Sequence, residues 1–182
     1  MLDIPDDRTS LALALRSRIR EIPDFPTAGV GFKDITPVLG DPGLFAAATR
    51  ALSEAFRDDG VTHVAGIESR GFLFAAPIAL DLGAGIIPIR KVGKLPFRTE
   101  RIDYGLEYGS ATLEVHVDAY VPGARVLVVD DVLATGGTAL AACALLERLG
   151  AEVAGLGFLL SLGFLPGVER LAGRRVESLL DY

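Results

Sequence analysis

The sequence predicts an α/β fold with a mostly parallel central sheet flanked by helices, a small N-terminal element and a mobile lid. Short apolar runs alternate with helical patterns over most of the chain, which is typical of parallel sheets whose crossovers are helices. Half of the 182 residues are hydrophobic, enough for a sizeable core. A segment rich in proline and glycine, residues 22–43, separates the first helix from these units.

The N-terminal region is expected to hold two helices. Ser10 is a plausible N-cap of the first, because four apolar residues follow at helical spacing: Leu11, Leu15, Ile19 and Ile22. The proline- and glycine-rich segment after it is expected to be irregular. A second helix is predicted over 44–57, ended by Gly60.

The rest of the chain is predicted to alternate strands and helices. The expected strands are 61–67, 85–89, 112–117, 125–129, 153–160 and 176–180, and the expected helices are 72–82 and 138–149. Residues 91–108 form a polar, basic stretch without a predicted element. Ligands of parallel sheets bind beyond the carboxyl ends of the strands. The loops after Ile67, Ile89, Val129 and Leu160 are therefore the places to expect a site.

Composition excludes several classes of protein. The length suits a single domain, residues 1–182, and the net charge of −6 argues against a nucleic-acid partner. No stretch has the continuous apolar length of a membrane span, and the acidic start does not resemble a signal peptide, so we expect a cytoplasmic protein. The lone Cys143 lies among alanines and leucines and is expected to be a core residue.

The most informative stretch is Val126–Leu140, "VLVVDDVLATGGTAL". Asp130 and Asp131 follow a buried strand, and a loop of small residues with two glycines leads into a helix. Such a loop can bind an anion through backbone N–H groups, while the carboxylates suit sugar hydroxyls. Neither a Walker loop nor a dinucleotide fingerprint is spelled here. The alternative is a plain strand–turn–helix in which the aspartates cap the helix.

The same stretch resembles the phosphoribosyl-pyrophosphate motif of the type I phosphoribosyltransferase family. Four flanking segments resemble its adenine-specific branch: "FPTAGVGFKDITPVL", "GIESRGFLFAAPIAL", "PIRKVGKLP" and "LEYGSATLEVHVDA". The resemblance covers the chain from about Ile22 to its end. It implies the type I phosphoribosyltransferase fold and transfer of a phosphoribosyl group from 5-phosphoribosyl 1-pyrophosphate to N9 of adenine, giving AMP and pyrophosphate.

The resemblance also implies roles for individual residues. Asp130 and Asp131 would bind the ribose hydroxyls and help to balance positive charge on the ribosyl ring. The 5-phosphate would be held by Ala134, Thr135, Gly136, Gly137 and Thr138. Pyrophosphate would be bound by Glu68, Ser69, Arg70, Arg90, Lys91 and Lys94, with a cis peptide between Glu68 and Ser69 and with Arg70 also contributing to catalysis.

Proton transfer and base recognition are implied for other segments. Glu107 matches the residue proposed as general acid/base, within a lid of about residues 95–108 that excludes water. Adenine would contact Val30, Gly31, Phe32 and Lys33, within an N-terminal arm of about residues 1–35, and also Leu162. The sequence departs from many family members at Gly31, Lys33, Ser161 and Val168.

The expected cofactor is Mg²⁺, carried by the oxygens of the substrate rather than by a dedicated protein cage. A homodimer is expected from the family, with the helix from Leu44 and the segment Phe72–Phe74 as candidate contacts. Two alternatives remain: a transferase for another purine, such as xanthine or guanine, and a regulatory protein that uses the fold to sense phosphoribosyl pyrophosphate.

Overall fold

The computed structural model describes residues 7–105 and 110–182. The chain divides into two compact units, Met1–Ala51 and Leu52–Tyr182, and each is described here by itself.

The first unit begins with α1, Arg8–Arg18. Its N-cap is Asp7, whose carboxylate accepts hydrogen bonds from the N–H groups of Thr9 and Ser10 at 2.8 and 2.9 Å. The prediction that Ser10 caps this helix was therefore wrong, because one carboxylate satisfies two of the free N–H groups at the helix start. Ile22 also lies beyond the helix, in a strand.

The segment expected to be irregular contains short elements. β1, Arg20–Ile22, pairs antiparallel with β2, Phe32–Asp34, and two ion pairs join them: Arg20 to Asp34 at 2.6 Å and Lys33 to Glu21 at 3.0 Å. α2, Thr36–Leu39, follows, and then α3, Pro42–Glu54, which crosses into the second unit. Strands of three residues are too short to show an alternating pattern in the sequence.

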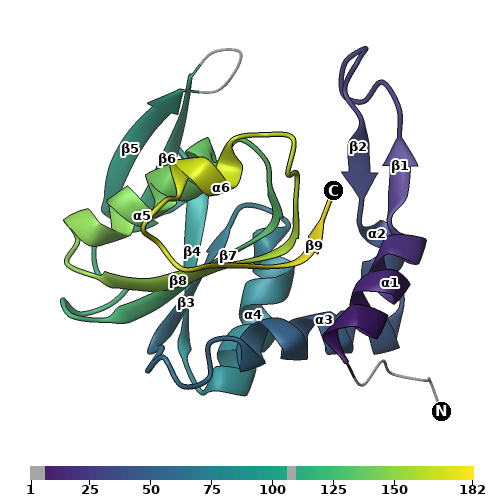
Figure 1. Ribbon diagram of the computed structural model, residues 1–182. Helices are drawn as coiled ribbons and strands as arrows, with labels where there is room; N and C mark the ends of the chain where they lie inside the picture. The colour runs from purple at the N-terminus through teal and green to yellow at the C-terminus, as the bar shows by residue number, and fades with distance from the viewer. Residues whose placement is uncertain (1–6, 106–109) are drawn as a thin grey trace. The chain divides into compact units, whose positions relative to one another are not determined.

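The second unit is built on a seven-stranded sheet in the order β5-β6-β4-β3-β7-β8-β9 (Figure 1). Neighbours from β4 to β9 run parallel, whereas β6 is antiparallel to both β4 and β5. The fold class predicted from the sequence is confirmed. The strands are β3 His63–Ile67, β4 Gly85–Lys91, β5 Thr99–Gly105, β6 Ser110–His116, β7 Arg125–Leu133, β8 Glu152–Ser161 and β9 Val176–Asp181.

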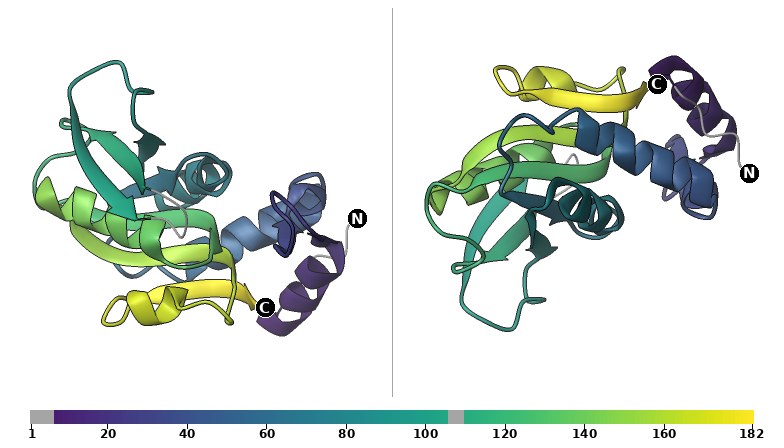
Figure 2. Two further views of the ribbon diagram at one scale, coloured as in Figure 1. Left: turned by 90° about the horizontal axis from the view of Figure 1, so that it is seen from above. Right: turned by 90° about the horizontal axis from the view of Figure 1, so that it is seen from below.

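Two helices cover this sheet. α4, Gly71–Leu82, connects β3 to β4, and α5, Gly137–Arg148, connects β7 to β8. These crossovers lead away from two neighbouring strands in opposite directions, so right-handed connections place them on opposite faces (Figures 1 and 2). A short helix, α6 Gly167–Arg170, follows β8. Cys143 is fully buried on α5, as predicted, and burial raises the pKa of its thiol to about 11.

Two differences from the predicted elements concern the site. β7 extends to Leu133, beyond the predicted end at Val129, because β8 continues alongside it and pairs with Val132 and Leu133. The polar stretch after β4 contains β5, which forms an antiparallel hairpin with β6. The polar residues of β5 are compatible with its position at the sheet edge. Of the helices described, none is both long and apolar enough to cross a membrane.

Close packing against β8 gives a first prediction. A Cβ on Gly155 would lie 2.5 Å from a ring carbon of Phe56, whereas one on Gly157 would make an ordinary contact of 3.5 Å with the same ring. Gly155→Ala should lower the free energy of unfolding by about 1–3 kcal/mol, because a fully buried ring must move. Gly157→Ala, on the same strand, is the matched control and should change it by less than about 0.5 kcal/mol. Denaturant unfolding measures both, and equal effects would contradict the packing argument.

Candidate functional site

The candidate site lies at the carboxyl ends of β3 and β7, where these two strands cease to pair. β3 pairs with β7 only as far as Gly66 and Val129, so Asp130 and Asp131 continue beyond the end of β3 with a strand neighbour on the β8 side alone. The helices that follow β3 and β7 leave toward opposite faces. A crevice at such a reversal of strand order is where open α/β sheets bind ligands.

Arg70, the N-cap of α4, forms an ion pair with Asp131. The Asp131 side chain is only 6% exposed and that of Arg70 is 43% exposed. The positive charge of the guanidinium therefore compensates the negative charge of a nearly buried carboxylate. The structure thus joins two residues that lie far apart in sequence and were predicted to act in one site. The peptide between Glu68 and Ser69 is cis, which confirms that prediction.

Asp130 faces a different environment from its neighbour. It is half-buried, and its Oδ1 accepts a hydrogen bond from the Asp131 N–H at 2.9 Å. Burial, and secondly the charge of Asp131, raise the pKa of Asp130 well above its ordinary value. Its surroundings also depend on Gly71, where a Cβ would lie 2.9 Å from Asp130 Oδ1 and 2.7 Å from the carbonyl oxygen of Val129. These surroundings therefore disfavour the charged form of Asp130.

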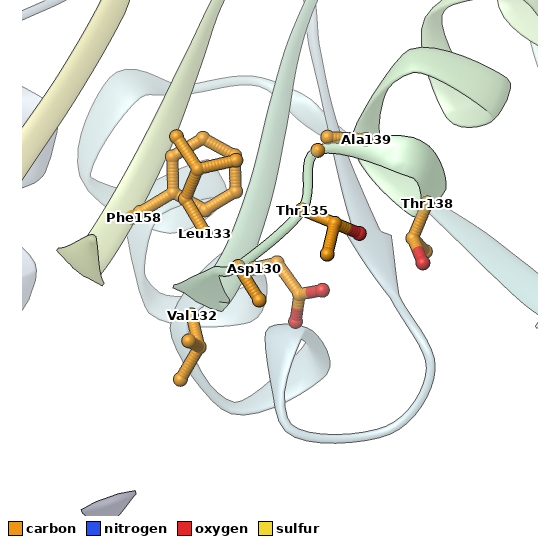
Figure 3. Close-up of a pocket in the computed structure, with 9 residues that line it drawn as sticks. Asp130, Val132, Leu133, Thr135, Thr138, Ala139 and Phe158 are labelled. Atoms are coloured by element: carbon orange, nitrogen blue, oxygen red, sulfur yellow. The ribbon is translucent and has the colours of Figure 1, made fainter. Parts of the chain in front are cut away.

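The loop between β7 and α5 encloses a small cavity of about 80 Å³. Figure 3 shows the Asp130 carboxylate and the hydroxyls of Thr135 and Thr138 around one space, with Leu133 and Phe158 to one side of it. Gly136 turns the chain into α5 with a positive φ of 77°. As in any helix, the first N–H groups of α5 have no partner within the helix itself, and they are available to an anion. The cavity is far smaller than the several hundred Å³ of a whole ligand site, and suits a phosphate group.

This loop is supported closely from α6. A Cβ on Gly136 would lie 2.8 Å from the carbonyl oxygen of Gly167, and one on Gly167 would lie 2.2 Å from that of Ala134. Glycine at both positions therefore allows the two backbones to touch. On the other side, the Thr138 hydroxyl lies 3.4 Å from the Tyr104 hydroxyl of β5. Strands and helices far apart in sequence thus fix the loop predicted to bind phosphate.

Glu68 lies beside this crevice and is surrounded by donors. Its side chain is 8% exposed and contacts Lys94 Nζ at 2.5 Å and Arg90 Nε at 3.2 Å. The Lys91 N–H donates to it at 3.1 Å. Burial alone would raise the pKa of Glu68, but these hydrogen bonds and charges outweigh it and lower the pKa. Except for the exposed Ser69, the predicted pyrophosphate residues are therefore linked here in two groups, Glu68 with Arg90, Lys91 and Lys94, and Arg70 with Asp131.

The residues predicted to bind a base are divided between the units. Phe32 and Lys33 belong to β2, and the Phe32 ring packs edge-on against Phe25 with centroids 5.1 Å apart. Val30 and Gly31 precede them and are exposed. Leu162 directly follows β8 in the second unit, and its N–H donates to the carbonyl of Leu133 at 2.9 Å.

Two further positions complete the comparison with the sequence. Ser161, where the sequence departs from many family members, is buried and its hydroxyl donates to Asp181 of β9. Ser161 is thus engaged within the sheet. Glu107, the predicted acid/base, lies outside the described residues.

Sequence reasoning missed two residues that shape the site. Gly71 allows α4 to approach Asp130, but a glycine at the start of a helical pattern carries no distinctive signal. Glu114 of β6 is a fully buried carboxylate, hydrogen-bonded to the backbone beside Lys94. Its place in an alternating strand, "TLEVH", suggested a solvent-facing position instead. That interpretation was wrong because the turn at Lys94 and Leu95 packs over the Glu114 carboxylate and donates two backbone hydrogen bonds to it.

Comparisons with known proteins agree with this geometry. The phosphoribosyl transferase domain family matches residues 37–175. An adenine phosphoribosyltransferase from Methylococcus capsulatus is 56% identical over 168 residues, which cover 92% of this chain and 98% of that protein. One from Myxococcus xanthus is 56% identical over 174 residues, covering 96% and 95%.

Solved structures give the same result. The crystal structure of adenine phosphoribosyltransferase from Rhodothermus marinus aligns with a TM-score of 0.91 at 50% identity, covering 96% of this chain and 99% of that one. The Saccharomyces cerevisiae enzyme, solved with an imino-altritol bisphosphate and adenine, aligns with a TM-score of 0.89 at 40% identity, covering 94% and 99%.

The raised pKa of Asp130 gives a second prediction. A carboxyl whose pKa is higher in the folded than in the unfolded protein destabilises the fold once the pH exceeds its unfolded pKa, and costs nothing below it. Asp130→Asn should therefore raise the free energy of unfolding by about 0.5–2 kcal/mol near pH 7, and by much less near pH 4. Denaturant unfolding at both pH values provides the measurement.

Asp131→Asn is the matched control for this experiment. It removes the carboxylate that Arg70 binds, so the free energy of unfolding should fall by about 1 kcal/mol near neutral pH. A destabilised Asp130→Asn protein near pH 7 would show that the Asp130 charge is well tolerated, which would contradict the prediction.

Proposed function

The chain belongs to the phosphoribosyl transferase family, and we propose that it transfers the phosphoribosyl group of 5-phosphoribosyl 1-pyrophosphate to adenine, giving AMP and pyrophosphate. The observation that carries this is the convergence of two groups at one edge of the sheet. Asp130 and the loop 134–138 lie at the end of β7, and the cations around Glu68 lie at the ends of β3 and β4. They suit opposite ends of one sugar that carries a phosphate and a pyrophosphate.

The reaction breaks the bond between C1 of the ribose and a pyrophosphate oxygen, and forms a bond from C1 to N9 of adenine. The electron pair of the breaking bond leaves with pyrophosphate, and the N9 proton must be removed. Positive charge develops on the ribosyl ring between these events, as in other glycosyl transfers. The residues of the site therefore have to stabilise a transient cation and a departing polyanion together.

Asp130 and Asp131 act on the ribose. The pKa of Asp130 is raised by its surroundings, so a positive ring beside it favours its ionised form and is stabilised in return. This interaction strengthens as the bond breaks, which is what accelerates a reaction rather than merely binding its substrate. The hydroxyls of Thr135 and Thr138 and the N–H groups at the start of α5 bind the 5-phosphate.

Arg70, Arg90 and Lys94 stabilise the leaving pyrophosphate. Arg90 and Lys94 contact Glu68, and Arg70 contacts Asp131, so each cation is held near the crevice by a carboxylate. Pyrophosphate exchanges with these carboxylates and gains short, charge-assisted hydrogen bonds. The Lys91 N–H, now bonded to Glu68, is a further donor at this position.

Base recognition and proton transfer are assigned from the family resemblance. Val30, Gly31, Phe32, Lys33 and Leu162 contact adenine, with the Phe32 ring offering an aromatic face. Glu107 exchanges the proton with adenine, and the lid of residues 95–108 keeps water from the ribosyl cation.

Magnesium is proposed as the cofactor. Over residues 7–105 and 110–182 the structure holds no group of three or more His, Cys, Asp or Glu side chains arranged for a metal ion. Asp130 and Asp131 are the carboxylates near the proposed position of the sugar. Two carboxylates suit a Mg²⁺ ion that is bound mainly by oxygens of the substrate and by water. When bound, Mg²⁺ would neutralise part of the pyrophosphate charge.

A panel of labelled bases tests the proposed function. With 5-phosphoribosyl 1-pyrophosphate and Mg²⁺, adenine should be converted to its nucleotide, and hypoxanthine, guanine and xanthine at least about a hundredfold more slowly, because a 6-oxo group reverses the hydrogen-bond polarity at C6. Chelation of Mg²⁺ should abolish turnover.

Controls for this panel use the acidic pair. Asp130→Asn with Asp131→Asn should reduce kcat by roughly a hundredfold or more, since both ribose carboxylates lose their charge. Conversion of an oxopurine alone would identify a different purine transferase. No turnover of any base, together with ligand-dependent binding of RNA or DNA, would identify a regulatory protein of the same fold.

We also propose that the chain works in the cytoplasm as a homodimer. Leu73 and Leu80 of α4 are 46% and 84% exposed and lie seven residues apart, on one side of the helix, where a second copy could cover them. Sedimentation velocity should give twice the chain mass of 19.2 kDa. Leu80→Asp should shift the protein toward the monomer, and a native protein that sediments as a monomer at micromolar concentration would contradict the proposal.

A further inference from the structure

Glu114 is a buried charge that the proposed mechanism does not use. It lies near the middle of β6, opposite Arg90 in β4 and Arg101 in β5, and its side chain is 0% exposed. A buried carboxylate is costly unless hydrogen bonds and opposite charge compensate it. Its partners therefore indicate what it does.

The two oxygens of Glu114 have different partners. Oε1 accepts hydrogen bonds from the backbone N–H groups of Lys94 and Leu95, both at 2.9 Å. Oε2 lies 3.2 Å from Arg101 Nε and 3.3 Å from the Thr99 hydroxyl. Burial would raise the pKa of Glu114, but the backbone hydrogen bonds and the Arg101 charge outweigh it and lower the pKa.

The backbone bonds matter because this segment has left the sheet. The last ladder contact of β4 is between Lys91 and Leu113, followed by a bond from Val92 N–H to the Thr112 carbonyl. Beyond it, the N–H groups of Lys94 and Leu95 are both bonded to the Glu114 side chain. Glu114 thus replaces a strand as the support of this turn.

Lys94 is consequently held at two places. Glu114 fixes its backbone N–H, and Glu68 binds its amine, with Nζ and Oε1 2.5 Å apart. The Lys94 carbonyl also accepts a hydrogen bond from Arg90 Nη1 at 3.2 Å. One buried carboxylate from β6 therefore sets where this lysine and its neighbouring arginine reach the end of β3.

We propose that Glu114 is a positioning residue for pyrophosphate: it holds the Lys94 turn so that the lysine amine can pass from Glu68 to the leaving group. This rests on the proposed function of the site. The competing role is electrostatic, in which Glu114 only neutralises Arg101 and joins β5 to β6.

Two conservative variants separate these roles. Glu114→Gln keeps an oxygen at the distance needed to accept the Lys94 and Leu95 N–H groups, but removes the charge. Glu114→Asp keeps the charge, but withdraws both oxygens by one methylene. If Glu114 acts by position, Glu114→Asp should raise the KM for pyrophosphate, in the reverse reaction with AMP, roughly tenfold. Glu114→Gln should raise it by less than about threefold, and the KM for AMP should change by less than about twofold in both.

A Lys94→Ala background shows whether the effect passes through the lysine. There, Glu114→Asp should change the KM for pyrophosphate by less than about twofold, since two residues acting through one contact are not additive. A merely structural role would give the same factor in both backgrounds. Calorimetric titration with magnesium pyrophosphate repeats the comparison without turnover, so that it also holds if the native enzyme acts on another base.

Three outcomes would overturn the proposal. In the first, Glu114→Gln is impaired and Glu114→Asp is not, which is the electrostatic role. In the second, the variants raise the KM for AMP and the KM for pyrophosphate by the same factor. In the third, the effect of Glu114→Asp is undiminished by Lys94→Ala.

Discussion

The compensation of carboxylates by cations at one edge of the sheet is the constraint on which the site depends. Glu68 and Asp131 are nearly buried there, and each would be costly alone. Arg70 compensates Asp131, while Arg90 and Lys94 compensate Glu68. The cations at this edge are thereby kept in place by acids of the same site, and they do not destabilise the protein as isolated buried ions would.

The topology of the sheet makes this arrangement possible. The pairing of β3 with β7 ends at Val129, whereas β7 continues beside β8. Among the strands that the structure describes, Asp130 and Asp131 therefore have a neighbour on the β8 side and none on the β3 side. Because α4 and α5 leave toward opposite faces, the turn at Arg70 and the loop before α5 diverge around that position. The same reversal of strand order therefore supplies space for a ligand and brings residues from distant parts of the chain to its two sides.

Sequence was sufficient for the parts of the molecule that repeat a strong local pattern. The strands β3, β4, β7 and β8 and the helices α4 and α5 follow from apolar runs and helical periodicity, and the motif of β7 led to the family. Short elements were not predictable, since β1, β2 and α6 contain too few residues for any periodicity.

The site residues divide along a similar line. Asp130, Thr135 and Thr138 stand together in one motif, and the structure places them around one cavity. Glu114 could not be found in this way, because its importance arises from its contacts with a turn some twenty residues earlier in the chain. The capping of α1 by Asp7 instead of Ser10 was a choice between two neighbouring candidates, decided by which side chain reaches two N–H groups.

The pairing of Arg90 and Lys94 with Glu68 has a consequence for competition from small anions in the cell. An incoming anion must compete with an internal counter-ion that is already well positioned, and it gains only the difference between the two sets of contacts. Inorganic phosphate has fewer oxygens than pyrophosphate, so it can replace fewer of the contacts that Glu68 makes with these cations. In the proposed reaction, a pyrophosphate group tethered to a sugar whose other phosphate binds at α5 would meet the same cations at a high effective concentration. Selection against abundant simple anions would thus follow from cations that already have an internal carboxylate partner.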